Sequence, residues 1–433
     1  MADFKKAAFH TLGCKVNQYD TEAMLESFER AGYQIVPFTD EADVYLVNTC
    51  TVTGTGDQKS LKLMRRIARE HPHSGIIAAG CLAQRDAEKL LTMDNVYLAI
   101  GVQRRAEVVD LYEQAALSGV PINAVAPLKN ASFESLFVAR HEGKTRATMK
   151  IQEGCDRYCS YCIIPSVRGP VRSMPIDAVR AEAERLAGAG YKEIVVTGIH
   201  LGSYGRGEDY SLIDAIKAVH ATGVRVRIGS LEPVTVTDSF ARELSMLPNI
   251  MRQFHLSMQS GSDTVLRRMR RRYDSAEYLR AVETLRRYMP DCALTTDVIA
   301  GFPGETDAEH RETLAFIERV AFARIHVFPY SRRSGTLADR MDGHVSEELK
   351  KIRAQELINL GNKLELSFVK HTENTVQTVL FETSDGEYSE GYTQHYVRVR
   401  AKAVPGEIRK VLITCAEGTT AIGEACPPTG GEN

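Results

Sequence analysis

The chain has 433 residues, of which 43% are hydrophobic and 25% are charged, and its formal net charge is −2. This length predicts two to four domains rather than one core, and the near-neutral balance excludes a protein that is basic over its whole surface. No apolar run approaches the roughly 20 residues that span a bilayer, so we expect no membrane contact and a cytoplasmic location, where cysteines serve as ligands, catalytic thiols or buried residues rather than disulfides.

Residues 1–105 alternate short apolar strands with helix-like segments, which is typical of a doubly wound, mostly parallel α/β sheet. Three of the expected strands end at a cysteine, namely Cys14, Cys50 and Cys81. Because the carboxyl ends of parallel strands lie along one edge of a sheet, these thiols are expected to meet there. The alternative is that all three are small buried core residues, a common role of free cysteine.

The rest of the chain is expected to form three further parts. Residues 106–145 begin within a helix and then lose any period, so they predict a connector. Residues 146–345 hold six strand-like segments, five of them followed by helix-like stretches, which predicts a barrel or partial barrel with its site at the carboxyl ends of the strands. After a linking helix at 346–371, residues 372–433 predict a small β-barrel and a tail.

The stretch "EGCDRYCSYC" places Cys155, Cys159 and Cys162 close together, directly after the first strand of the six-strand array. A structural zinc site takes four protein ligands, usually in two paired arms, but no second pair lies near this run and the next histidine is His200. A cubane [4Fe–4S] cluster is held by cysteine thiolates, and three of them leave one iron open. The spacing therefore predicts a cluster with one iron free to bind a substrate or cofactor.

This Cys-x-x-x-Cys-x-x-Cys spacing resembles the signature of the radical S-adenosylmethionine (SAM) enzymes. The resemblance implies that SAM chelates the open iron and is cleaved to a 5′-deoxyadenosyl radical, which abstracts hydrogen from an unactivated carbon. It also implies that Tyr161 contacts adenine. Asp297, Ile299 and Gly301 in "DVIAGFPGE" follow the GxIxGxxxE pattern of that family, with Asp297 in place of the first glycine, and their strand edge and turn are expected to offer backbone groups to adenine.

Two further strand ends carry polar residues suited to SAM. Ser230 and Glu232 in "GSLEP" lie two apart on one face, where they fit ribose hydroxyls or the SAM ammonium group. Gln259 in "SMQSG" takes the equivalent place on the next strand. The alternatives are an ordinary turn for the glycine-rich stretch and helix capping for Ser230.

The whole chain resembles the radical SAM methylthiotransferase family, through "TLGCKVNQYD", "VNTCTVT", "AAGC", "GCDRYCSYCIIPSVRGPVRS" and "GSLEP". The resemblance implies an α/β fold with an N-terminal doubly wound domain, a central radical SAM partial (β/α)6 barrel and a C-terminal OB-like TRAM β-barrel. It implies a second, auxiliary [4Fe–4S] cluster on Cys14, Cys50 and Cys81. One SAM would methylate a sulfur on that cluster, another would generate the radical, and an electron donor such as flavodoxin or ferredoxin would be required.

The stretch "GCKVNQ" resembles one branch of that family. This branch adds a methylthio group at C2 of N6-threonylcarbamoyladenosine at position 37 of tRNA. Two other branches stay open: the same reaction on N6-isopentenyladenosine tRNA, and methylthiolation of an aspartate of a ribosomal protein. The alternative from another class is a non-catalytic Fe–S RNA-binding protein.

Clustered arginines and aromatic side chains predict an RNA-binding surface. They are Arg267, Arg268, Arg270, Arg271 and Arg272 in "VLRRMRRRY", Arg168 and Arg172 in "SVRGPVRS", and Tyr392, Tyr396 and Arg398 in the small barrel. The alternatives are a solvated charged face for the arginines and ordinary strand packing for the tyrosines.

Overall fold

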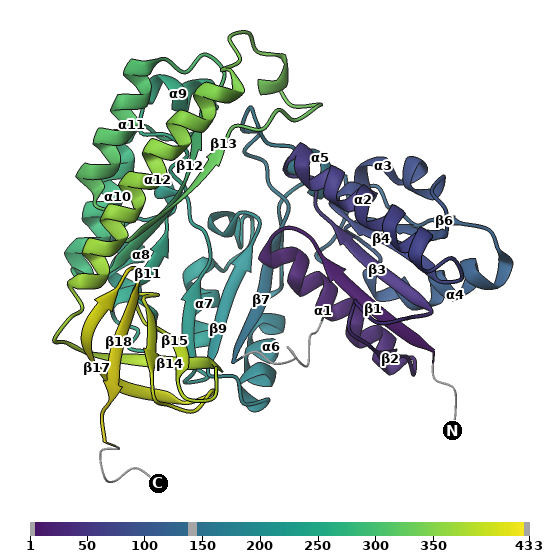
Figure 1. Ribbon diagram of the computed structural model, residues 1–433, viewed down its shortest axis with the longest axis horizontal. Helices are drawn as coiled ribbons and strands as arrows, with labels where there is room; N and C mark the ends of the chain where they lie inside the picture. The colour runs from purple at the N-terminus through teal and green to yellow at the C-terminus, as the bar shows by residue number, and fades with distance from the viewer. Residues whose placement is uncertain (1–4, 137–144, 428–433) are drawn as a thin grey trace.

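The computed structural model describes residues 5–136 and 145–427. The segments outside the described residues are 1–4, 137–144 in the expected connector, and 428–433 in the expected tail. Figure 1 shows a partial barrel with an N-terminal α/β domain beside it and a small β-barrel at its lower end. The predicted α/β fold class is confirmed. Among the described residues, no helix is long and apolar enough to cross a membrane.

The N-terminal domain is a parallel sheet with helices on both faces (Figure 1). Strands β3 and β4 read "VYLVNT" and "GIIAAG" and are buried along their whole length, as expected for strands covered on both sides. The strands are β1 (Lys6–Thr11), β2 (Gln34–Ile35), β3 (Val44–Thr49), β4 (Gly75–Gly80), β5 (Val96–Ile100) and β6 (Ile122–Asn123). The helices are α1 (Lys15–Arg30), α2 (Gly54–Glu70), α3 (Cys81–Leu91), η1 (Arg105–Glu107) and α4 (Val108–Ser118).

This domain extends past the boundary at residue 105 that the sequence predicts. The strand order is β2-β1-β3-β4-β5-β6, so β6 adds a last strand, parallel to β5. Helix α4 packs on the same face as α1 through Val108 and Tyr112. The connector prediction is therefore wrong for residues 106–123. A strand of two residues is too short to show the alternation by which strands are recognised.

The partial barrel contains the six parallel strands that the sequence predicts. Two hydrogen-bonded sheets, β10-β9-β7-β8 and β11-β12-β13, are joined by isolated bridges such as Leu231–Leu256. The strands are β7 (Arg146–Glu153), β8 (Arg172–Ser173), β9 (Glu193–Gly198), β10 (Arg225–Ile228), β11 (Gln253–His255), β12 (Ala293–Ala300) and β13 (Arg324–Pro329). The helices are α5 (Ile164–Arg168), α6 (Ile176–Gly188), η2 (Leu201–Ser203), α7 (Leu212–His220), η3 (Pro233–Thr235), α8 (Asp238–Ser245), α9 (Asp263–Arg268), α10 (Ser275–Tyr288), α11 (Asp307–Val320) and η4 (Ala338–Arg340).

Helix α12 (Glu347–Lys370) leads from the partial barrel to the small barrel. It lies so close to β13 that a Cβ on Gly361 would stand 2.6 Å from Ile325 Cγ1. The small barrel is closed, in the order β14-β15-β16-β18-β17, around a core that includes Val379, Phe381 and Val411. Its strands are β14 (Val376–Ser384), β15 (Ser389–Thr393), β16 (Arg398–Ala401), β17 (Ile408–Glu417) and β18 (Thr420–Ala425).

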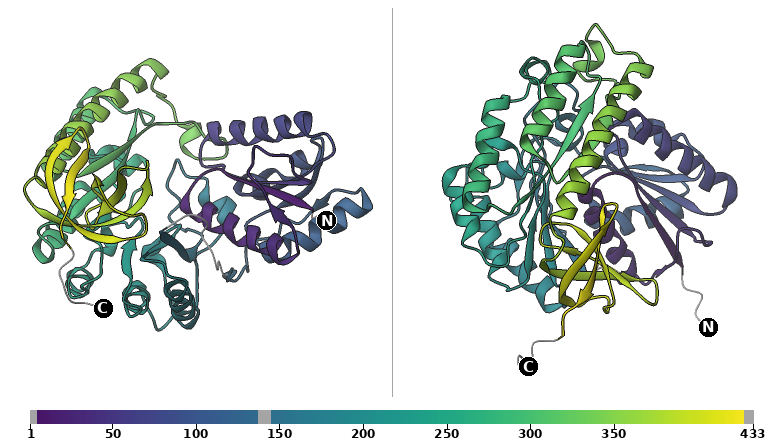
Figure 2. Two further views of the ribbon diagram at one scale, coloured as in Figure 1. Left: turned by 60° about the horizontal axis from the view of Figure 1, so that its bottom comes forward. Right: turned by 60° about the vertical axis from the view of Figure 1, so that its left-hand side comes forward.

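The N-terminal domain and the small barrel contact the partial barrel on different sides, as the two views of Figure 2 show. Arg146 of β7 pairs with Glu382 of β14 at 2.5 Å, and Arg333 after β13 pairs with Asp57 of α2 at 2.5 Å. Charged side chains therefore contribute to both contacts between the parts.

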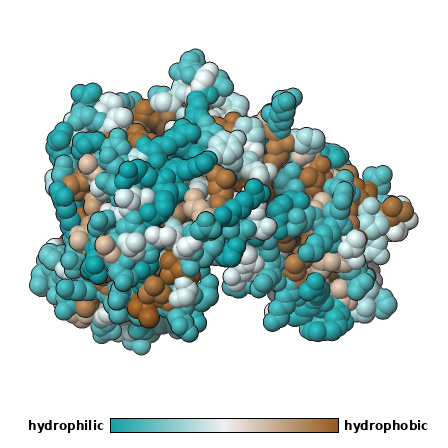
Figure 3. All heavy atoms as spheres, turned by 90° about the horizontal axis from the view of Figure 1, so that it is seen from above, coloured by the Kyte–Doolittle hydropathy of each residue, from teal (hydrophilic) through white to brown (hydrophobic). Residues whose placement is uncertain are grey.

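The surface seen in Figure 3 is largely hydrophilic with separate hydrophobic spots, and an indentation divides its two lobes.

Candidate functional site

Cys14, Cys50 and Cys81 lie together at the carboxyl edge of the N-terminal sheet. Each directly follows or closely follows one of three adjacent strands, β1, β3 and β4. Gly13 has a φ of +106°, and a Cβ there would stand 2.9 Å from Cys50 Sγ, so only glycine lets the Cys14 loop approach so closely. Burial, together with the neighbouring Cys14 and Cys50, raises the pKa of Cys81 to about 11 against the lowering effect of Arg168.

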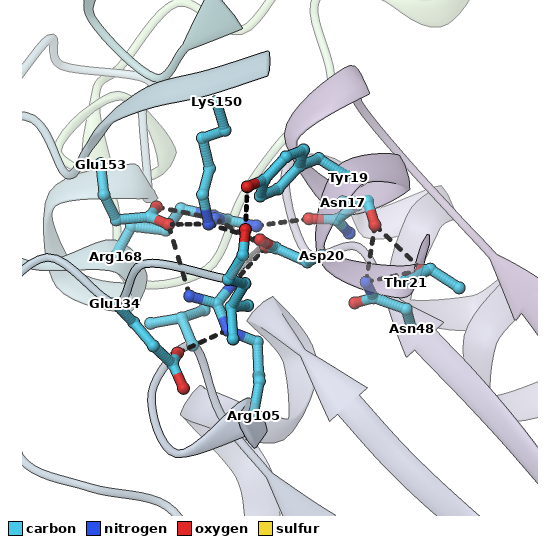
Figure 4. Close-up of polar contacts among 12 residues, drawn as sticks. Asn17, Tyr19, Asp20, Thr21, Asn48, Arg105, Glu134, Lys150, Glu153 and Arg168 are labelled. Atoms are coloured by element: carbon cyan, nitrogen blue, oxygen red, sulfur yellow. Dashed lines mark hydrogen bonds and ion pairs between the residues drawn. The ribbon is translucent and has the colours of Figure 1, made fainter. Parts of the chain in front are cut away.

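A buried charged network lies beside Cys81, and Figure 4 shows the polar contacts within it. Arg168, the last residue of α5, has a side chain that is 1% exposed. Its Nε donates to Cys81 Sγ at 3.2 Å, and its Nη1 donates to Glu153 Oε1 at 2.7 Å. Arg168 Nη2 also donates to Asn17 Oδ1, and Nη1 lies 3.4 Å from Asp20 Oδ2. One guanidinium thus joins a cysteine of the N-terminal sheet to the strand that precedes the other cysteine set.

The second set, Cys155, Cys159 and Cys162, lies in the loop between β7 and α5. The loop is fixed by main-chain bonds: the N–H of Cys155 donates to Gly169 O at 3.1 Å and that of Cys162 donates to Cys159 O at 3.0 Å. Burial raises the pKa of Cys155 to about 11 and that of Cys162 to about 12. These thiols therefore keep their protons near neutral pH until a metal displaces them.

A second buried arginine lies beside this loop. Arg271 Nη1 donates to Cys159 Sγ at 3.2 Å, and Nη2 lies 3.1 Å from Glu232 Oε1. Glu232 Oε2 also accepts from Arg157 Nε at 2.7 Å and is 2.7 Å from His200 Nε2. Burial opposes ionisation of this carboxyl, but the hydrogen bond from His200 and the charge of Arg271 outweigh it and lower the pKa of Glu232 to about 2. Glu232 is therefore an anion at neutral pH.

The donor chemistry at both places fits [4Fe–4S] clusters. Each place gathers three thiols, and each has one buried guanidinium that donates to a sulfur, which favours the thiolate form that iron requires. Within the described ranges, no three His, Cys, Asp or Glu side chains are arranged to hold a single metal ion. A cubane is wider than one ion, so its thiolates need not converge on one point.

The structure brings several predicted SAM contacts together. Tyr161 packs edge-on against Phe302, with ring centroids 6.3 Å apart, and both belong to an apolar cluster that includes Ile299. The N–H of Gln259 donates to Asp297 O, and Ile299 N donates back to Gln259 O, each at 2.9 Å. Gln259 has a φ of +70°, a strained conformation of the kind that gathers at functional sites.

Three other predicted SAM residues take different positions. Ser230 is exposed after β10. Asp297 lies 3.4 Å from His255 Nε2 on the neighbouring strand. The N–H of Gly301 donates to Glu305 Oε1 at 3.0 Å, so this group is used within the turn. The glutamate of the same motif thus occupies this N–H, and the contact of adenine with other backbone groups of the strand edge and turn stays a prediction.

The predicted RNA surface is only partly exposed. Arg168, Arg172 and Arg271 have buried side chains, and Arg168 and Arg271 are paired with carboxylates, so the assignment of all three to phosphate contacts is wrong. Arg268 makes a bidentate pair with Glu309 at 2.9 and 2.8 Å. In the sequence these residues appear only as clustered arginines, and it does not indicate the distant carboxylates with which Arg168, Arg268 and Arg271 pair.

The remaining RNA candidates divide in the same way. Arg267, Arg270 and Arg272 are exposed. Arg398 is exposed but pairs with Glu390. The rings of Tyr392 and Tyr396 stack on each other with centroids 4.6 Å apart, and Arg227 of β10 lies 4.6 Å from the Tyr396 centroid. Tyr396 thus takes part in the contact between the small barrel and the partial barrel, so its assignment as an open stacking surface is wrong.

Sequence reasoning missed the carboxylates and cations of the buried networks. No sequence pattern assigns a role to Asp20, Arg105, Lys150 or Glu153. The signal was present for Glu153 and Arg157, because both flank cysteines of the motif "EGCDRYC". A charged residue next to a metal-ligand run is a reason to look for a buried partner.

Two family models match the chain. One is described as an uncharacterized protein family, UPF0004, and matches residues 6–101. The other is the Radical SAM superfamily, which matches residues 149–317. The first range holds the three cysteines of the N-terminal sheet, and the second holds the cysteine loop after β7.

Curated relatives match over nearly the whole length. The threonylcarbamoyladenosine tRNA methylthiotransferase MtaB of Bacillus subtilis (strain 168) is 41% identical over 415 residues, which covers 94% of this chain and 92% of the relative. The tRNA-2-methylthio-N(6)-dimethylallyladenosine synthase of Bacillus pumilus is 34% identical over 438 residues, with 97% and 86% covered. Among solved structures, the radical SAM methyltransferase TsrM from Kitasatospora setae matches with a TM-score of 0.59 and 13% identity over 78% of this chain and 77% of that one. This last likeness concerns the fold alone.

Proposed function

The chain belongs to the radical SAM tRNA methylthiotransferase family, and from this premise we propose that it converts N6-threonylcarbamoyladenosine at position 37 of tRNA into its 2-methylthio form. It is an enzyme of this type, with SAM and [4Fe–4S] clusters as cofactors. Family membership contradicts the alternative of a non-catalytic Fe–S RNA-binding protein. The substrate base, the count of two clusters and the roles of individual residues are proposals.

The observation that carries the proposal is the pair of three-cysteine sites on adjoining domains. The set in the loop after β7 would hold the cluster that binds SAM, and the set at the ends of β1, β3 and β4 would hold the auxiliary cluster. When bound, these groups supply a SAM-derived radical at the first site and the sulfur at the second. A single site would account for radical chemistry but not for the inserted sulfur.

The chain's own residues orient the reacting groups. Glu232 holds Arg157 and Arg271 beside the cysteine loop, so the charged end of SAM would meet a fixed set of charges rather than mobile side chains. Tyr161 and Phe302 form an apolar wall next to Ile299, which fits the face of adenine. Neither role requires a general base, because hydrogen-atom abstraction removes a proton and an electron together.

The substrate assignment is supported by similarity. Identity to the threonylcarbamoyladenosine enzyme is 41%, against 34% for the dimethylallyladenosine synthase, and both relatives cover more than nine-tenths of the chain. The stretch "GCKVNQ" around Cys14 points to the same branch. The second candidate is N6-isopentenyladenosine tRNA, which is favoured only by the extent of the match to the synthase.

The experiment is an anaerobic assay on three substrates. The protein, reconstituted with iron and sulfide, is given SAM, a reductant and either tRNA bearing N6-threonylcarbamoyladenosine, tRNA bearing N6-isopentenyladenosine, or the ribosomal protein. We expect mass spectrometry of digested products to show a methylthio group on the first substrate alone. Modification of the second or third substrate instead would overturn the assignment.

The partners are proposed from the same geometry. Arg267, Arg270 and Arg272 are exposed, and Arg272 Nη2 donates to Asp156 O in the cysteine loop at 3.3 Å. These side chains are therefore placed to meet tRNA phosphates beside the reaction site.

A flavodoxin or ferredoxin would supply the electron that reduces the cluster. The cytoplasm is the proposed location, because tRNA and thiol ligands that must stay reduced are found there.

A further inference from the structure

The network around Arg168 connects the two cysteine sites through the protein interior. Its anions are Asp20 of α1, Glu134 and Glu153 of β7, as Figure 4 shows. Its cations include Arg105, whose Nε is 2.9 Å from Glu134 Oε2, and Lys150, whose Nζ is 2.5 Å from Asp20 Oδ1 and 3.2 Å from Glu153 Oε2. Residues from both domains are thus mutually paired and almost wholly shielded from water.

A fourth cation, Arg172, is buried beside this network. Arg105, Lys150 and Arg168 offset the three carboxylates, but Arg172 is also buried beside them, and its Nε and Nη2 have no hydrogen-bond partner in the described structure.

Arg168 joins a cysteine of one site to the strand end that leads to the other. Its Nε donates to Cys81 Sγ at 3.2 Å, while its Nη1 donates to Glu153 Oε1 at 2.7 Å. Glu153 stands two residues before Cys155 on the same strand end. The rigid guanidinium fork therefore spans the distance between a sulfur of one site and the residue that begins the loop of the other.

We propose that Arg168 is the positioning residue of the auxiliary site: it holds the Cys81 sulfur by a charged N–H···S bond and fixes that site relative to the cysteine loop after β7. This inference rests on the proposed two-cluster function. A positive donor next to a cluster sulfur stabilises the reduced, more negative cluster, so Arg168 also raises the reduction potential of the auxiliary cluster.

The test isolates the auxiliary cluster. In full-length protein with Cys155, Cys159 and Cys162 replaced by alanine, the remaining cluster is reconstituted, its iron and sulfide are counted, and its midpoint potential is followed by electron paramagnetic resonance. We expect Arg168→Gln to shift the potential to a more negative value and Arg168→Lys, which keeps the charge but not the fork, to shift it less.

Arg105→Gln is the matched control, because Arg105 is equally buried and pairs with Asp20 and Glu134 but does not contact Cys81. It should weaken domain docking without moving the potential. Equal shifts in Arg168→Gln and Arg105→Gln, or no shift in Arg168→Gln, overturn the inference. If Arg168→Gln does not fold, Arg168→Lys against Arg105→Gln decides in the same way. Absence of any cluster in the triple-alanine background overturns the two-cluster proposal together with this inference, while a normal cluster that ignores Arg168 overturns the inference alone.

Discussion

The two cysteine sites are built in opposite ways. One takes its thiols from a single loop of eight residues, Cys155 to Cys162, after one strand. The other takes them from the ends of three neighbouring strands and exists only when the N-terminal sheet is folded. Yet each has one buried arginine that donates to a sulfur at 3.2 Å, Arg271 at Cys159 and Arg168 at Cys81.

The difference lies in where the counter-charges come from. Arg271 is paired with Glu232, a residue of the same partial barrel. Arg168 is paired with Glu153 of the partial barrel and with Asp20 of the N-terminal domain. The loop site is therefore complete within one domain, whereas the sheet-edge site depends on the docking of two. Local sequence can specify the first kind of site, and only the tertiary fold can specify the second.

The largest expected effect comes from removing one thiol at each site. Cys155→Ala should abolish both formation of 5′-deoxyadenosine and methylthiolation, because SAM loses its cluster. Cys81→Ala should leave 5′-deoxyadenosine formation in place and abolish the methylthio product. Mass spectrometry of 5′-deoxyadenosine and of the methylthio product measures the difference between the two variants. Cys415 is an exposed cysteine of β17, and its replacement by alanine is the control that should keep both products. Loss of SAM cleavage in Cys81→Ala would refute the division of roles.

Breaking the interdomain network should be the next largest effect. Glu153→Gln leaves Arg168 and Lys150 without their shared carboxylate in a site that is 2% exposed. Removing one partner of a buried pair typically costs about 3–5 kcal/mol, so we expect a loss of that order in the first transition of a urea titration. The control is Asp177→Asn, which breaks the exposed pair with Arg180 and should change stability by less than about 1 kcal/mol. Equal effects of the two variants would show that the network does not hold the domains together.

The pH dependence of the unfolding free energy tests how much the ion pairs of Glu232 contribute to the loop site. Its pKa is about 2 in the folded protein, against roughly 4.3 for an unperturbed glutamate. Since the folded pKa is the lower one, its ion pairs stabilise the protein above about pH 4.3, and this contribution is lost as the pH falls towards 2. A shift of this size corresponds to roughly 3 kcal/mol at neutral pH.

The metal-free protein and its Glu232→Gln variant should therefore differ in unfolding free energy near pH 7 and converge as the pH falls towards about 2. Urea titrations at several pH values measure the difference. A constant difference across this range would mean that the carboxylate charge contributes nothing to the site.

Much of this molecule could be predicted from its sequence because the signals are local. The strand–helix repeat indicated the partial barrel, and the spacing of Cys155, Cys159 and Cys162 indicated the loop site. The convergence of Cys14, Cys50 and Cys81 followed from one physical rule about parallel strands. Strand β6 could not be predicted, because a strand of two residues is too short to show a periodic pattern.

The arginines show where sequence reasoning stops. Arg271 looks the same in sequence as the exposed Arg270 and Arg272, since all three stand in one basic run, and nothing next to Arg168 in "SVRGPVRS" marks it as buried. Whether an arginine is buried depends on carboxylates far away in the chain. Asp20 is 148 residues from Arg168, and Glu232 follows β10 whereas Arg271 follows α9. A basic run therefore predicts positive charge, but not whether that charge faces RNA or a sulfur.

The smallest expected effect concerns the exposed arginines beside the loop site. Replacing Arg267, Arg270 and Arg272 by alanine should weaken tRNA binding, because each exposed guanidinium that meets a phosphate releases counterions on binding. The slope of log affinity against log salt should fall by about 1 for each arginine–phosphate pair that the substitutions remove.

Fluorescence anisotropy of labelled tRNA at several salt concentrations measures that slope. The matched control replaces Arg180, Arg280 and Arg287, whose side chains are 58%, 66% and 64% exposed on other helices, and should leave the slope unchanged. Equal weakening in both triple variants would mean that the RNA reads only overall charge. No weakening in either triple variant would place the RNA on another face. The loop site would then resemble the sheet-edge site, whose Arg168 is buried and paired with carboxylates rather than open to RNA.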